Sequence, residues 1–168
     1  MTTSCVRTEE TPAYRATANN TGLSDNDIIA LASAILYRDM ERGPLVADPD
    51  VAGMYCATQL HGLEREAFGA LFLDNQHRVL GFEILFQGTI DGAQVYPREV
   101  VKAALRHNAA AVIVTHNHPS GHLDPSAADR AVTSRLKAAL EVVDVRLLDH
   151  FIVGPGSKPV SFAARGLL

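Results

Sequence analysis

An uninterrupted apolar segment near the middle of the chain constrains the fold most strongly. Residues 109–114 read Ala-Ala-Ala-Val-Ile-Val, and stretches with helical periodicity lie on either side of them in the sequence. A strand with apolar side chains at every position must be covered on both faces, so this segment is predicted to be a central strand. The polar sequence Thr-His-Asn-His-Pro-Ser-Gly follows at once. Its side chains are expected just past the carboxyl end of that strand, where open α/β sheets bind ligands.

Start signals and apolar spacing predict four helices, the first and last of which begin with capping boxes at Ser24 and Ser126. The helices are expected over residues 25–41, 49–59 and 97–107 and from Ser126 onward. In the second helix the predicted inner face carries Val51, Ala52 and Tyr55. In the last helix it carries Ala128, Val132, Leu136 and Leu140.

Further strands are expected on both sides of the central one. The runs 68–73 and 78–86 are joined by the turn-forming residues 74–77, which predicts an antiparallel hairpin. Another strand is expected over 145–153, and 160–162 is expected to add a short edge strand. The order of elements predicts an α/β sandwich, in which helices flank a mixed β-sheet.

The composition limits the domain organisation and the class of protein. A chain of 168 residues with 47% hydrophobic residues can form one domain with a full core. We expect a disordered, threonine-rich leader over 1–22, a short helical segment over 23–60 and the main domain over 61–168. The net charge of −4 argues against a broad surface for nucleic acid.

Targeting signals and cysteine motifs give the expected environment. The first twenty residues contain no apolar core segment, and no later run approaches the length of a membrane span. The two cysteines, Cys5 and Cys56, form no Cys-x-x-Cys pair, so neither a disulfide framework nor a cysteine zinc cluster is indicated. We therefore expect a cytoplasmic protein that does not bind membranes.

His116, His118 and Asp129 form a candidate metal site. On an extended segment the two histidines point to the same side, and turn-forming residues between His118 and Asp129 can bring the carboxylate back to them. Two nitrogens and one oxygen suit zinc and leave a fourth ligand position open, as in catalytic zinc sites. Taken singly, each histidine can be a surface residue, and Ser126 to Asp129 can be an ordinary capping box.

A catalytic ion also needs a group that transfers protons, and a glutamate is the expected one. Upstream candidates are Glu64, Glu66 and Glu83. Glu66 stands at the entry of the strand expected from residue 68, which favours it. Glu64 would replace it if that strand began two residues earlier.

The combination of Glu66, His116-Asn117-His118-Pro119 and Ser126-Ala127-Ala128-Asp129 resembles the JAMM (MPN+) metalloprotease pattern, and within that superfamily the RadC-like branch. Further segments typical of that branch are 86–89, 95–99, 116–121 and 148–150, and the resemblance covers roughly residue 60 to the C-terminus. The resemblance implies a fold similar to that of cytidine deaminases. The deaminase signature itself, with His-x-Glu and Pro-Cys-x-x-Cys, is absent.

The resemblance also implies the roles of the site residues. His116, His118 and Asp129 would bind one Zn²⁺ per chain, Glu66 would be the general acid and base, and Ser126 would donate to the developing oxyanion. The expected activity is hydrolysis of amide bonds in a peptide or protein substrate, by a metallopeptidase or isopeptidase. The alternative is a non-enzymatic module that binds protein or DNA in DNA repair or genome maintenance, with a vestigial or structural metal.

Two further polar positions receive a structural interpretation. His122, in the turn after Gly121, is expected to be an exposed loop residue, although it could serve as a spare ligand. Of Asp149 and His150, which lie in an apolar strand, one is expected to face the edge of the site and the other solvent.

Overall fold

The computed structural model describes residues 24, 27, 43, 45–46, 48–88 and 94–168. The chain divides into two units, Met1–Arg42 and Gly43–Leu168. In the first unit Ser24 N donates to Asp27 Oδ2 at 2.8 Å and Asp27 N donates to Ser24 Oγ at 3.2 Å, as the predicted capping box requires. The leader predicted over 1–22 and most of the helix predicted over 25–41 lie outside the described residues.

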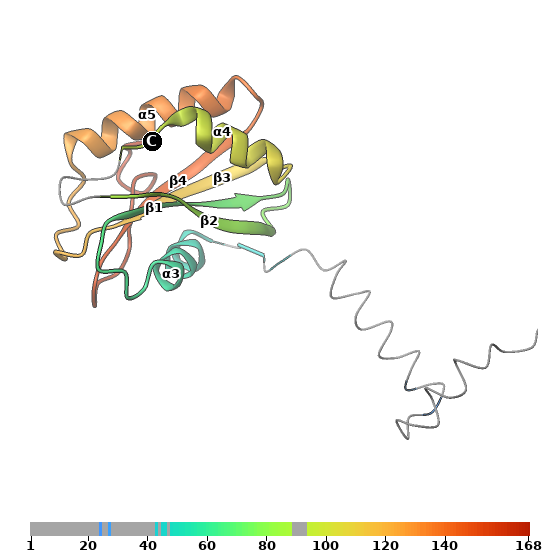
Figure 1. Ribbon diagram of the computed structural model, residues 1–168, viewed down its shortest axis with the longest axis horizontal. Helices are drawn as coiled ribbons and strands as arrows, with labels where there is room; N and C mark the ends of the chain where they lie inside the picture. The colour runs from blue at the N-terminus through green and yellow to red at the C-terminus, as the bar shows by residue number, and fades with distance from the viewer. Residues whose placement is uncertain (1–23, 25–26, 28–42, 44, 47, 89–93) are drawn as a thin grey trace, which may run out of the picture. The chain divides into compact units, whose positions relative to one another are not determined.

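The second unit contains a five-stranded mixed sheet with the order β2-β1-β3-β4-β5 (Figure 1). The strands are β1 (Ala67–Leu73), β2 (Val79–Gln87), β3 (Ala111–Asn117), β4 (Arg146–Val153) and β5 (Val160–Ser161). β1 pairs antiparallel with both β2 and β3, β3 pairs parallel with β4, and β4 pairs antiparallel with β5. The predicted hairpin, mixed sheet and short edge strand are confirmed.

Helices cover both faces of the sheet. α3 (Pro49–Gln59) lies on one face, and α4 (Pro97–Arg106) and α5 (Ala127–Glu141) lie on the other (Figure 1). Each face has its own apolar core, one that includes Phe72 and Leu136 and one that includes Leu71 and Phe151. This architecture is the predicted α/β sandwich.

The central strand β3 is longer than the sequence predicts. All seven of its residues are buried, and it continues to Asn117, so that His116 lies inside the strand. The extension arises because β3 is paired on both sides: His116 is opposite Phe68 of β1 and opposite Ile152 of β4. Neighbouring strands therefore extend the ladder into the polar sequence, beyond the apolar run.

The inner faces of two helices differ from the prediction. Val51 is 44% exposed, and the residues that α3 buries are Ala52, Gly53 and Cys56. At Gly53 a Cβ atom would lie 3.2 Å from Phe151 and from Pro159, so small residues allow α3 to approach β4 closely. In α5 Ala128 is exposed.

The residues that α5 buries are Thr133, Leu136 and Leu140. The predicted face was wrong at its first turn, where Ala128 is exposed. Among the described residues, no helix is both long enough and apolar enough to cross a membrane.

Candidate metal centre

β1 and β3 bring Glu66 and the two histidines together. Because the strands are antiparallel, the start of β1 lies beside the end of β3. His116 Nε2 and His118 Nε2 are 2.9 Å apart, and one potential ligand atom from each of Glu66, His116 and His118 lies within 4.8 Å of the other two. Of the three glutamates considered, Glu66 is the one in this cluster.

The other two glutamates lie elsewhere. Glu64 is exposed. Glu83 forms an ion pair with Arg106 and contacts His107 Nε2 at 2.5 Å.

The first turn of α5 adds Asp129 to the cluster. Asp129 Oδ1 lies 3.3 Å from His116 Nε2. The other carboxylate oxygen, Oδ2, accepts hydrogen bonds from Ser126 Oγ at 2.6 Å and from Ser126 N at 2.8 Å. Asp129 N donates back to Ser126 Oγ at 3.1 Å. The capping box thus orients Asp129, with one oxygen on Ser126 and the other toward His116.

Burial and charge set the protonation of these groups. Burial raises the pKa of Glu66, the neighbouring His118 opposes this effect, and Asp129 adds to it. Burial alone would raise the pKa of Asp129, but the hydrogen bonds from Ser126 and the nearby histidines outweigh it and hold the pKa below its ordinary value. Burial lowers the pKa of His116 to about 4. A neutral imidazole beside an ionised carboxylate is the form in which both can bind a metal.

A chain of hydrogen bonds behind His116 determines which of its nitrogens carries the proton. Thr133 Oγ1 donates its single hydrogen to the carbonyl of Asp129 at 2.6 Å, because a carbonyl can only accept. The same hydroxyl contacts His150 Nδ1 at 2.6 Å, and must therefore accept from it. Burial lowers the pKa of His150 well below its ordinary value, so the ring is neutral and its Nε2 is an acceptor.

His116 Nδ1 lies 2.8 Å from His150 Nε2, and must donate to it. The lone pair of His116 therefore lies on Nε2, the nitrogen that faces His118 and Asp129. Partners of this kind fix the tautomer of metal-binding histidines.

His118 is oriented in the same way by the turn that follows it. Its Nδ1 donates to the carbonyl of His122, which can only accept. In neutral His118 the lone pair is then also on Nε2. Two imidazole lone pairs face each other across 2.9 Å, with the carboxylate of Asp129 beside them. A cation that accepts electron pairs from all three groups fits this arrangement of donors.

Two contributing groups were not predicted: Thr133, which acts behind His150, and the backbone carbonyl of His122, which acts behind His118. His150 contacts His116, in agreement with the expectation that one of Asp149 and His150 faces the site. The prediction that either Asp149 or His150 faces solvent was wrong, since both are buried. β4 is covered on both faces, by α5 and by α3, so alternation along the strand places neither residue in solvent. Parallel strands are normally covered on both faces, so a prediction that β4 pairs parallel with β3 would have implied that both residues are buried.

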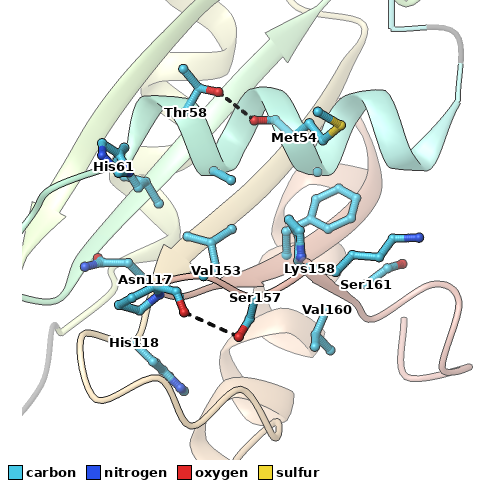
Figure 2. A pocket seen from close by; sticks show the side chains of 18 of the residues that line it. Met54, Thr58, His61, Asn117, His118, Val153, Ser157, Lys158, Val160 and Ser161 are labelled. Atoms are coloured by element: carbon cyan, nitrogen blue, oxygen red, sulfur yellow. Dashed lines mark hydrogen bonds between the residues drawn. The ribbon is translucent and has the colours of Figure 1, made fainter.

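A groove opens on the α3 face, behind the cluster. It lies between α3 and the segment 154–159, and its wall includes Asn117 and His118 (Figure 2). The side chains of Asn117 and His118, which are adjacent in the chain, point in different directions (Figure 2).

Cys56 lies in the core of the same face, where burial raises the pKa of its thiol to about 12, so this thiol is not a reactive group.

Comparisons with known proteins agree with this architecture. A sequence model described as "RadC-like JAB domain" matches residues 46–167, which include every residue of the cluster. A UPF0758 protein of Xanthomonas euvesicatoria is 59% identical over 138 residues, which is 82% of this chain and 61% of the relative. A UPF0758 protein of Halorhodospira halophila is 59% identical over 140 residues, 83% of this chain and 62% of the relative.

The chain thus spans a little over three fifths of the length of these relatives. The family match covers well over half of the chain, and the mixed sheet with its flanking helices is consistent with a JAB fold. The chain belongs to the RadC-like JAB domain family.

Proposed function

We propose that this protein is a zinc-dependent hydrolase of the JAMM type, which cleaves amide bonds in peptide or protein substrates. The observation that carries the proposal is the pair of imidazole lone pairs directed at one point, with Asp129 beside them and Glu66 within reach. This donor set binds metal and leaves room for a water molecule or a substrate oxygen. Family membership supports a hydrolase and does not specify the bond cleaved.

Zinc is the proposed ion because of the ligand types. Two imidazoles and one carboxylate are a common set for zinc, whereas magnesium and calcium prefer shells made almost entirely of oxygen. His116, His118 and Asp129 would hold one ion. When bound, zinc would supply a Lewis acid that polarises a carbonyl group and lowers the pKa of water.

Glu66 is the proposed general base and acid. It would accept a proton from the attacking water and then deliver that proton to the leaving amine. Burial raises the pKa of its carboxyl group above its ordinary value, which suits a group that must both accept and donate during one turnover. Its position at the start of β1 keeps it beside the histidines without making it part of the capping box.

Ser126 is the proposed hydrogen-bond donor to the oxyanion that develops on the substrate carbonyl. Its hydroxyl hydrogen is directed to Asp129 Oδ2. The hydroxyl would have to rotate to serve the substrate, and Ser126 N would continue to hold the carboxylate. The hydroxyl of Ser126 can therefore serve both partners in turn, Asp129 before the reaction and the substrate oxyanion during it.

The test compares Glu66→Gln with Glu64→Gln, a matched substitution at an exposed position in the same segment. Glu66→Gln should bind zinc as the original protein does and lose turnover of a peptide library by at least about 100-fold, as loss of a general base predicts. Glu64→Gln should retain full turnover. Equal turnover in all three proteins would contradict the role of Glu66, and zinc binding without turnover in any of them would favour the binding module.

A further inference from the structure

Asn117 lies between the two histidines in sequence, yet it faces the other side of the sheet. Successive side chains of a strand alternate between faces. His116 packs against Phe68 in the core beneath α4 and α5, whereas Asn117 forms part of the groove on the α3 face. Asn117 is therefore separate from the metal-binding cluster, although its two neighbours belong to it.

The side chain of Asn117 is buried and uses its hydrogen-bonding groups on a single distant segment. Its Oδ1 accepts from Ala67 N at 2.7 Å, and its Nδ2 donates to the carbonyls of Arg65 at 3.0 Å and Leu63 at 3.4 Å. These bonds span 50 to 54 positions in the sequence. Both hydrogens of the amide and one acceptor position are thereby occupied.

The segment that Asn117 holds is the one that carries Glu66. Residues 63–66 lie outside regular secondary structure, and β1 begins at Ala67. The regular pairing of β1 with β3 ends at Phe68 and His116. Beyond this pair, the Asn117 side chain accepts from Ala67 N, on one side of Glu66, and donates to the carbonyl of Arg65, on the other side.

The backbone of Glu66 has one further anchor, since its carbonyl accepts from Gly88 N at 2.6 Å. This bond comes from the end of β2, whereas the Asn117 bonds come from the strand that carries the histidines. Asn117 thus connects the backbone around Glu66 directly to the histidine strand. Displacement of a reacting group by about 1 Å can cost about 100-fold in rate.

We propose that Asn117 is the positioning residue for Glu66, which it holds at a fixed place relative to His116 and His118. The inference rests on the proposed role of Glu66 and deepens it. In this arrangement the middle residue of the His-Asn-His sequence serves the proton-transfer group, while the outer two serve the metal. Aspartate and serine cannot replace it, because the position requires one acceptor and two donor hydrogens.

The test uses Asn117→Asp, which preserves size and the acceptor for Ala67 N but removes both donations to Arg65 and Leu63. Asn117→Ala removes all three hydrogen bonds, including the one from Ala67 N, without adding a charge, and it replaces the aspartate variant if that variant fails to fold. Val145→Ala, a substitution at a buried position just before β4, controls for general loss of stability. Glu66→Gln provides the reference for loss of the glutamate.

Two readouts do not depend on turnover. The first is amide hydrogen exchange at Ala67, whose amide loses its acceptor in Asn117→Ala and should exchange at least about 10-fold faster in that variant than in Val145→Ala. The second is the visible absorption spectrum of the cobalt-substituted protein, which reports what surrounds the metal. Asn117→Asp should shift this spectrum in the same direction as Glu66→Gln, while zinc affinity stays within about threefold because all three ligands are intact.

Once a peptide substrate is found, kcat should fall by about 100-fold in Asn117→Asp with KM unchanged. Combining Asn117→Asp with Glu66→Gln should add little further loss, because both changes remove the same contribution. Unchanged exchange at Ala67 in Asn117→Ala, or a cobalt spectrum that keeps its original form in Asn117→Asp, would overturn the inference. A protein that binds no metal at all would instead contradict the proposed function, and the exchange comparison would still decide whether Asn117 anchors the segment.

Discussion

At the scale of single residues, the arrangement of the centre depends as much on the partners of the histidines as on the histidines themselves. Each imidazole donates from Nδ1 to a fixed partner, His150 for His116 and the carbonyl of His122 for His118, and directs Nε2 toward the cluster. The His-x-His spacing and the Ser-x-x-Asp sequence predict the candidate ligands, because both motifs are local in sequence. The partners behind them, His150 and Thr133, come from β4 and α5, and only the assembled sheet brings them to His116.

The chain of bonds behind His116 gives a prediction for Thr133. Thr133→Val keeps the shape of the side chain and removes the hydroxyl, so His150 loses the acceptor that fixes its tautomer. Zinc binding should weaken, by less than the roughly 10- to 100-fold that is typical when a direct partner of a metal-binding histidine is lost, because Thr133 acts on His116 through His150. Competition with a chromogenic chelator measures the affinity.

Thr133→Ser is the matched control, because it keeps the hydroxyl group. It should bind zinc within a few-fold of the original protein. Equal affinity of the valine and serine variants would show that the hydroxyl does not orient His150.

At the scale of secondary-structure elements, most of the architecture could be predicted from sequence. Turn residues mark the hairpin between β1 and β2, and Pro97 and Ser126 mark the starts of α4 and α5. The end of β3 could not be predicted, because the ladder continues through polar residues only where β1 and β4 are already in place. On α3 the prediction was right for Ala52 and wrong for Val51, because the close approach of the helix to Phe151 occurs at Gly53.

Contacts between β2 and α4 predict a dependence of stability on acid. Hydrogen bonds from Arg106, and then from His107, hold the pKa of Glu83 below its ordinary value of 4.5. A carboxyl group with a lowered pKa in the folded state stabilises that state fully above its unfolded pKa. The contribution is lost as the pH falls from about 4.5 through the lower folded value.

Glu83→Gln should therefore reduce stability at neutral pH and have a smaller effect in strong acid. Urea denaturation between pH 7 and pH 3 measures the difference between the two proteins. The size of the effect should be modest because Arg106 is largely exposed. A difference that does not change with pH would contradict an ionic contribution from Glu83.

At the scale of the whole molecule, the centre joins parts of the chain that are distant in sequence. Glu66 lies just before β1, the histidines lie at and just after the end of β3, and Asp129 lies in the first turn of α5. A ligand that binds the folded form and not the unfolded chain stabilises it by mass action. Metal binding should therefore be linked to the stability of the whole second unit.

Chelation should lower the melting temperature accordingly. Zinc at 100 times its dissociation constant adds about 2.7 kcal/mol to the free energy of unfolding. Thermal unfolding followed by circular dichroism, before and after removal of metal, measures the change. A His116→Ala/His118→Ala variant should show no response to the chelator, and an identical melt of the original protein in both conditions would argue against a tightly bound ion.

Metal content tests the central claim most directly. Elemental analysis of the protein, purified without a histidine tag or chelator, should find about one zinc ion per chain, as expected for a single three-ligand site. The His116→Ala/His118→Ala variant, purified in the same way, should contain none. Absence of metal from both proteins, even after zinc is supplied, would contradict the metal centre and with it the proposed hydrolase.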